Sequence, residues 1–138
     1  MNKNVKIKIV GAHGENEDRD VVKSECTGLY YDKNGKLYLK YTETDLETRS
    51  TRNALIKVAE PVVTVEYKGA TDTFMAFEPG KTTKSMYITP MGSMPIEIKT
   101  ESLTIELRED SLEIYIHYQI SLSGSEMTPA SIHIYATE

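Results

Sequence analysis

The sequence predicts an all-β fold: one closed, antiparallel up-and-down β-barrel of about eight to ten short strands. Apolar and polar residues alternate along most of the chain, which is the period of a strand with one dry and one wet face. Turn-forming residues separate these runs at short intervals, and no stretch has a convincing helical pattern. A flat sheet of that many strands has two long unpaired edges, so closure into a barrel is the economical arrangement. We expect this barrel to be a single domain spanning residues 1–138.

The alternation is clearest between residues 93 and 122, where three successive strands are expected. The first two runs each place three apolar residues on one face: Met94, Ile96 and Ile98, then Leu103, Ile105 and Leu107. The third run follows a polar turn and has a six-position stripe: Leu112, Ile114, Ile116, Tyr118, Ile120 and Leu122. In a closed barrel these stripes point inward, where they fill the barrel or line a cavity.

Shorter alternating runs predict the other strands, at residues 5–9, 21–31, 37–41, 63–67, 73–77 and 132–137. Asn34-Gly35 is a strong hairpin signal because both residue types tolerate the positive φ angles of a tight turn. Residues 78–81 fit a type II turn, in which Pro79 supplies a fixed φ and Gly80 a positive one. Further turns are expected at residues 45–47, 68–70 and 89–92.

Residues 48–58 admit two interpretations. Apolar residues of this segment can be placed along one side of a helix, but Ala54, Ile56 and Val58 also alternate with their neighbours. We favour a strand, because Glu60-Pro61 stops the run and the period of two resumes directly afterwards.

Composition narrows the class of protein. The formal net charge is −5 and the basic residues are scattered among acidic ones, so no nucleic-acid partner is expected. Short, interrupted apolar runs predict no membrane-spanning helix. The single cysteine, Cys26, excludes an intramolecular disulfide, and no secretion signal is recognised near the N-terminus, so a cytoplasmic location is expected. The sequence does not predict an oligomeric state.

Several segments, in this order and spacing, resemble the YwiB-like family of small bacterial proteins. They are Thr27-Gly28-Leu29-Tyr30-Tyr31, Leu37-Tyr38-Leu39-Lys40-Tyr41, Tyr67-Lys68-Gly69-Ala70, Phe77 with Gly80, and Tyr87-Ile88-Thr89-Pro90-Met91-Gly92. The resemblance spans nearly the whole chain and implies a calycin-like, lipocalin-like β-barrel. Because the family is of unknown function, the resemblance implies no catalytic residue and no cofactor, and function must be argued from the site.

The residues themselves predict no catalytic or metal site. A nucleophile elbow, a helix-borne metal motif and a phosphate-binding loop are all missing, so an enzyme is disfavoured but not excluded. His117 and His133 are expected on the polar faces of adjacent strands, where solvated histidines are the favoured interpretation over a metal pair. A register near His117 opposite His133 would place Tyr115 opposite Tyr135 on the same face. Cys26 is interpreted as a bystander thiol, and the acidic residues 15–20 as a solvated loop rather than a calcium site.

Four polar residues lie in phase with the inward apolar stripes: Tyr41, Arg52, Tyr67 and Tyr118. Buried hydroxyls and a guanidinium need hydrogen-bond partners, which other barrel residues, trapped water or a bound ligand can supply. The leading hypothesis is a non-catalytic binding module for a small, mainly apolar ligand, with these four residues fixing its polar group.

The second hypothesis is a protein-interaction scaffold that uses tyrosines of the outer strands and loops. The candidates are Tyr30, Tyr38, Tyr87, Tyr115 and Tyr135.

Overall fold

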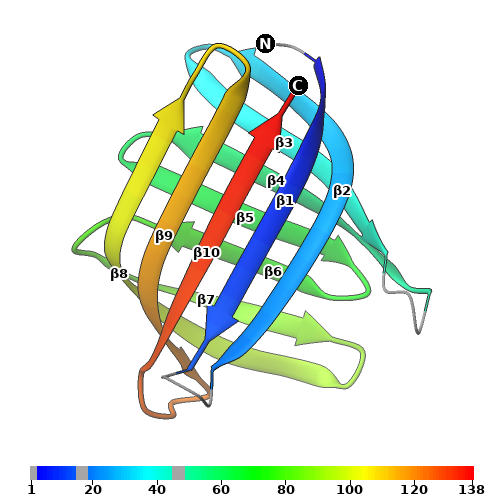
Figure 1. Cartoon of the computed structure of the whole chain (residues 1–138). Helices are drawn as coiled ribbons and strands as arrows, with labels where there is room; N and C mark the ends of the chain where they lie inside the picture. The colour runs from blue at the N-terminus through cyan, green and yellow to red at the C-terminus, as the bar shows by residue number, and fades with distance from the viewer. Residues whose placement is uncertain (1–2, 15–18, 45–48) are drawn as a thin grey trace.

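The computed structural model describes residues 3–14, 19–44 and 49–138, and these form ten β-strands in one closed barrel (Figure 1). The strands are β1 (Lys3–His13), β2 (Asp20–Lys33), β3 (Lys36–Thr44), β4 (Thr51–Ala59), β5 (Val62–Gly69), β6 (Asp72–Phe77), β7 (Thr82–Thr89), β8 (Gly92–Leu107), β9 (Ser111–Leu122) and β10 (Thr128–Thr137). Each strand pairs antiparallel with the next along the chain, and β10 pairs with β1 to close the barrel. The predicted all-β, up-and-down barrel is confirmed. The described part of the chain has no helix that is long and apolar enough to cross a membrane.

Strand β8 corrects one sequence-based expectation, because the first two predicted runs of residues 93–122 are a single strand of 16 residues. Thr100 pairs with Tyr118 and Ser102 with His117, so Glu101 is an extra residue in a β-bulge. The bulge moves the inward positions from even to odd residue numbers, from Ile98 to Leu103. This change of phase resembles a turn when only the alternation is considered.

The turns predicted at residues 34–35 and 78–81 are confirmed. Asn34 and Gly35 both have positive φ (54° and 76°) between β2 and β3. Gly80 has a φ of 79°, and the amide of Lys81 donates to the carbonyl oxygen of Glu78 at 3.0 Å. Strand β4 shows that the strand interpretation of residues 48–58 is right from Thr51 onward. The predicted turn at residues 45–47 and most of the acidic loop lie outside the described residues.

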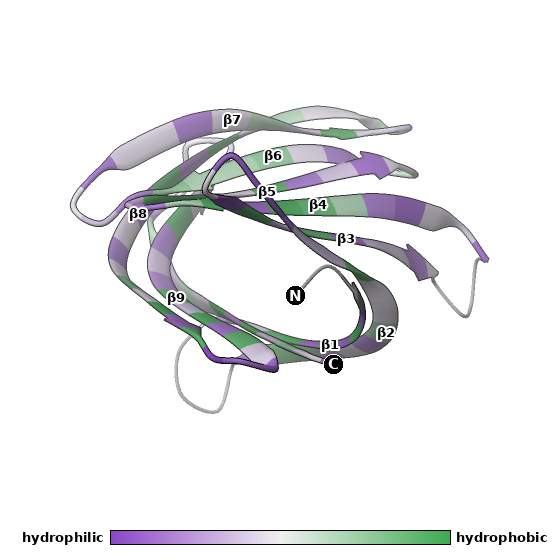
Figure 2. Cartoon of the chain, turned by 90° about the horizontal axis from the view of Figure 1, so that it is seen from above, coloured by the Kyte–Doolittle hydropathy of each residue, from purple (hydrophilic) through white to green (hydrophobic). Residues whose placement is uncertain are grey.

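Inward side chains fill most of the barrel with a continuous apolar core. The fully buried members include Ile56, Val63, Phe77, Leu112, Ile114 and Ile116. The ring of Phe77 meets the ring of Tyr118 edge to face, with centroids 4.9 Å apart. Figure 2 shows apolar and polar segments alternating along the strands that enclose this interior. The expected inward apolar stripes therefore form the core except at two ends, where Leu107 and Leu122 are 54% and 36% exposed and the prediction is wrong.

Thr100 is a buried polar residue within this core. Its side chain is 1% exposed, and its hydroxyl has no hydrogen-bond partner among the described residues. Its backbone is held by the turn before β7: Gly80 donates to its carbonyl oxygen at 3.0 Å, and its amide donates to Lys81 at 3.2 Å. The backbone contacts do not depend on the hydroxyl.

We therefore expect Thr100→Val to raise the free energy of unfolding by about 1 kcal/mol, since the buried unpaired hydroxyl is replaced by a methyl group of similar size. Urea denaturation of the two proteins measures this difference. Thr104→Val is the control, because Thr104 is exposed on the same strand. A Thr100→Val protein that is less stable than the parent would contradict the assignment of an unpaired hydroxyl.

Candidate functional site at one end of the barrel

A pocket of about 600 Å³ lies at one end of the barrel. Its walls come from β2 (Val22, Ser24, Glu25 and Cys26), β3 (Thr42, Glu43 and Thr44), the start of β4 (Ser50, Thr51 and Arg52), the β5–β6 turn (Ala70 and Thr71) and Tyr87 of β7. Because the barrel is up-and-down, these positions share the end where β1 joins β2, β3 joins β4 and β5 joins β6. The N- and C-termini lie at the other end (Figure 1).

The pocket forms where β2 and β3 separate. These two strands pair only from Gly28 opposite Tyr41 to Lys33 opposite Lys36. Beyond Gly28, residues 20–27 pair with β1 and residues 42–44 pair with β4. The space between the two diverging strands becomes the pocket, and inward residues of both strands line it.

A row of alternating small and large inward residues closes the barrel below the pocket. Along neighbouring strands the register aligns Gly28, Tyr41, Ala54, Tyr67, Thr73 and Tyr87. Ala54 stands between the two large rings of Tyr41 and Tyr67, and their hydroxyl oxygens are 3.5 Å apart. This alternation fits wide and narrow side chains into one layer of a small barrel.

Gly28 allows that layer to close. A Cβ at this position would lie 2.5 Å from the carbonyl oxygen of Lys40 and 2.7 Å from Cδ1 of Ile7. Real Cβ atoms do not approach backbone that closely, so only glycine fits beside Tyr41.

Above this row, Glu43 and Arg52 form an ion pair inside the pocket. They lie opposite each other on β3 and β4, and both Nε and Nη2 of Arg52 donate to Oε2 of Glu43 at 2.8 Å. The guanidinium also stacks over the ring of Tyr67, 3.8 Å from its centroid. The side chains of Arg52 and Glu43 are 32% and 18% exposed. The guanidinium is thus held on two sides and still reaches the pocket.

The surroundings also shift the pKa values of this cluster. Burial lowers the pKa of Arg52, but the carboxylate of Glu43 more than offsets this, so its pKa is raised and the charge is secure. Burial, with a smaller effect of Glu43, raises the pKa of the Cys26 thiol. Cys26 is therefore a protonated thiol at neutral pH, not an activated nucleophile.

The buried tyrosines have raised pKa values as well. Burial is the main cause for Tyr41, Tyr67 and Tyr118, and it raises the pKa of Tyr118 to about 12. A tyrosine in the unfolded chain has a pKa of about 10. Between these values the folded protein keeps a proton that the unfolded chain loses.

We therefore expect the free energy of unfolding to be constant up to about pH 9 and to fall as the pH rises from about 10 to 12. Urea denaturation at a series of pH values measures this decline. Tyr118→Phe should make the decline shallower, whereas Tyr115→Phe, which changes a more exposed ring, should leave it unchanged. Equal declines in the parent and Tyr118→Phe proteins would show that the Tyr118 hydroxyl does not contribute.

Comparison with known proteins identifies the family. The profile of a domain of unknown function, DUF1934, matches residues 7–134. The chain belongs to the DUF1934 family. The uncharacterized β-barrel protein YwiB of Bacillus subtilis (strain 168) is 30% identical over 110 residues, which are 79% of this chain and 75% of YwiB. The crystal structure of the B. subtilis ywiB protein matches with a TM-score of 0.87 and 24% identity, over 99% of this chain and 92% of that one. The resemblance noted in the sequence is thus confirmed, and the structural match shows the shared barrel fold.

The four predicted ligand-binding residues of this DUF1934 protein occupy three different environments. Only Arg52 lines the pocket. Tyr67 supports Arg52 from below, and Tyr41 contacts Tyr67. Tyr118 lies in the core against Phe77. Three other residues line the pocket but were not predicted to bind a ligand: Glu43, Thr71 and Tyr87. Glu43 could have been predicted, because it continues the alternation of Leu37, Leu39 and Tyr41.

The tyrosines of the interaction hypothesis do not form one outer surface. Tyr30 is buried, and Tyr87 contributes to the pocket, so both expectations of an outer position are wrong. They face inward because they lie opposite inward Leu39 and Thr73. Tyr38 stacks on Tyr31, with centroids 4.9 Å apart. The other two candidates are exposed: Tyr115 and Tyr135.

The two histidines do not lie directly opposite each other. His133 lies opposite Tyr115, and His117 lies opposite Ser131, a shift of two residues from the register that would pair the histidines. The ring of Tyr115 lies between the histidines, 4.5 Å from His117 and 5.1 Å from His133. Among the residues that the structure describes, no group of three or more histidine, cysteine or acidic residues is placed to hold a metal ion. The calcium alternative concerned mainly residues 15–18, which lie outside the described ranges.

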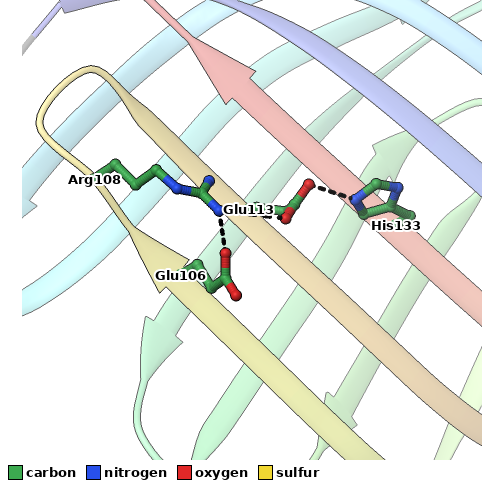
Figure 3. A network of polar contacts seen from close by, with 4 residues as sticks. All are labelled: Glu106, Arg108, Glu113 and His133. Atoms are coloured by element: carbon green, nitrogen blue, oxygen red, sulfur yellow. Dashed lines mark hydrogen bonds and ion pairs between the residues drawn. The ribbon is translucent and has the colours of Figure 1, made fainter.

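His133 instead joins an outer network of polar side chains (Figure 3). Its Nε2 lies 3.0 Å from Oε2 of Glu113. Arg108 donates to Glu106 and lies 3.9 Å from Oε1 of Glu113. These contacts tie β8, β9 and β10 together on an exposed face, where each is worth a small amount of stability.

Proposed function

We propose that this DUF1934 protein is a non-catalytic binding module that takes a small molecule in the pocket between β2 and β3. The observation that carries the proposal is the Glu43–Arg52 pair, which is fixed by its own hydrogen bonds and by Tyr67 yet lines an accessible pocket. Pockets of this size suit small ligands, and a few well-placed polar groups set their orientation.

The lining favours a polar ligand over the mainly apolar one expected from the sequence. Side chains of the core fill the apolar part of the barrel, whereas the pocket presents a carboxylate, a guanidinium and several hydroxyls. The raised pKa of Cys26 supports binding over nucleophilic catalysis, because the thiolate is the reactive form. The cytoplasmic location stays a prediction.

Native mass spectrometry of the protein purified from its own cells tests this proposal. We expect an extra mass under gentle conditions that is lost on denaturation, and we expect Arg52→Met to carry less of it. Arg108→Met is the matched control, because Arg108 lies on the outer network. A protein that shows only the mass of its chain, and that gains no ligand from a cell extract, would overturn the binding proposal.

A smaller surface supports the interaction scaffold as the second candidate. Tyr115, His117 and His133 form a cluster of rings on the outer face, and exposed Tyr135 follows on the same strand as His133. Aromatic side chains of this kind are enriched at protein interfaces. A protein-sized extra mass in the same spectra, abolished by Tyr115→Ala but not by Arg52→Met, would favour this function.

A further inference from the structure

We infer that the ligand of the pocket is a zwitterion, a small molecule with one cationic and one anionic group, of the kind found in free amino acids and short peptides. This inference rests on the proposed binding function and names its ligand class. It follows from the charges of the pocket, from one unpaired hydroxyl and from the exposed backbone of β2.

The charges of the pocket disfavour a ligand with a single charge. The described charged residues that line it are Glu25, Glu43 and Arg52. The side chain of Glu25 is 75% exposed and its carboxylate lies 3.6 Å from Nζ of Lys8, so the charges inside the pocket are those of Glu43 and Arg52. Glu43 and Arg52 are in direct contact, so an anion that reaches Arg52 also approaches the carboxylate, and a cation that reaches Glu43 also approaches the guanidinium. A zwitterion avoids this conflict, because its anionic group can face Arg52 while its cationic group faces Glu43.

Geometry limits how the pair can respond. Tyr67 supports the guanidinium from below, and the ring position is set by its contact with Tyr41. The two donors on one edge of the guanidinium bond a single oxygen of Glu43, at 2.8 Å each. A ligand that adds to the pair without separating it therefore requires little rearrangement, which favours binding.

The hydroxyl of Thr71 adds a second observation. The hydroxyl oxygen itself is buried and has no hydrogen-bond partner among the described residues, whereas other atoms of Thr71 line the pocket. A buried hydroxyl normally has a partner, and a rotation of this side chain toward the pocket would let a carboxylate or an ammonium group of a ligand supply one.

The edge of β2 offers backbone groups to the same ligand. Residues 20–27 pair with β1 on one side, and no described strand pairs with them on the other. In a two-residue hairpin, the two residues that flank the turn hydrogen-bond to each other through their backbone N–H and C=O groups. Lys33 flanks the turn and pairs with Lys36 of β3. The backbone N–H and C=O groups of the odd-numbered residues of β2 therefore point away from β1. Glu25, which lines the pocket, is one of these odd residues. Its N–H and C=O, which face the side that no described strand pairs with, suit the amide or carboxylate of an amino acid or short peptide.

Isothermal titration calorimetry tests the ligand class. The probes are the standard amino acids and alanine-containing dipeptides, with glucose as a neutral polar probe and 1-octanol as an apolar probe. Each zwitterion that binds is compared with its N-acetylated form, which lacks the cation, and its C-amidated form, which lacks the anion. We expect each blocked form to bind about tenfold more weakly or worse.

Two variants assign the charges to residues. In the Glu43→Gln protein the site for the ligand's cation is gone, so the N-acetylated form should bind as tightly as the zwitterion. In the Arg52→Met protein the site for the ligand's anion is gone, so the C-amidated form should bind as tightly as the zwitterion. A merely structural role for the pair would weaken all forms of the ligand equally. Glu101→Gln, in the bulge of β8, is the control, and thermal unfolding verifies that each variant is folded.

The possible outcomes distinguish failure of the zwitterion inference from failure of the proposed binding function. Binding of a blocked form as tightly as the zwitterion, or of glucose or 1-octanol alone, would overturn the zwitterion and leave the binding module intact. A panel in which no probe binds, together with a neutral or singly charged ligand in the native mass spectra, would also overturn the zwitterion alone. No binding in the panel and only the mass of the chain in the native spectra would overturn both.

Discussion

Phe77→Ala is expected to lower the free energy of unfolding by about 3 to 5 kcal/mol, the range for removing a buried ring. Phe77 is 0% exposed, faces Val63 across the β5–β6 pair and meets Tyr118 edge to face. It is a fully buried member of the core, so its removal leaves a cavity that neighbouring strands cannot fill without bending. For a small domain this is a large part of the total stability.

Phe74→Ala is the matched control for this experiment. Phe74 is the other phenylalanine of the chain and lies on the same strand, but it faces outward and is 45% exposed. We expect its replacement to cost less than about 1 kcal/mol. Urea denaturation of both variants measures the two costs, and similar values would contradict the assignment of inner and outer faces in β6.

Gly28→Ala is expected to lower the free energy of unfolding by about 2 to 3 kcal/mol, although it adds only one methyl group. The new Cβ would overlap the backbone oxygen of Lys40, and that oxygen belongs to the neighbouring strand. Relief requires β2 and β3 to separate further, which also moves Tyr41 and the floor of the pocket. On the proposed binding function, the variant should also bind its ligand more weakly than the parent protein.

Gly11→Ala provides the comparison. Gly11 also lies within a strand, on β1, but a Cβ there would meet no atom within 4 Å. We expect little change, or a slight gain from the reduced freedom of the unfolded chain. Thermal unfolding of the two variants side by side gives the measurement, and a Gly28→Ala protein as stable as Gly11→Ala would show that the row below the pocket is not tightly packed.

The sequence was sufficient for the fold because the alternation of apolar and polar residues persists through nearly every strand. It was insufficient where the period of two changes phase or disappears. The bulge at Glu101 made one strand look like two. Strand β7 has no apolar stripe: its inward positions are Thr83, Ser85 and Tyr87, and only the predicted turns on both sides indicate it.

The candidate site was only partly predictable, since alternation gives the face of a residue but not its height along the barrel axis. Arg52 and Tyr118 are both inward, but one reaches the pocket and the other is in the core. The pocket itself follows from the separation of β2 and β3, which depends on long-range pairing and leaves no local pattern. Glu43 is inward by the same alternation that identified Tyr41. An acidic residue in an apolar stripe could therefore have been predicted as a candidate site residue.

Both ends of the described chain leave the barrel on the side away from the pocket, where Lys6 lies opposite Thr137 (Figure 1). An attachment made at either terminus, whether a fused domain, an affinity tag or a link to a solid support, therefore starts at the far end from Arg52. Their adjacency also means that a short linker can join them, with new ends opened at the Asn34-Gly35 turn. Such a rearranged chain would keep the pocket end free of cut or tethered residues, so the proposed binding could be tested with immobilised protein.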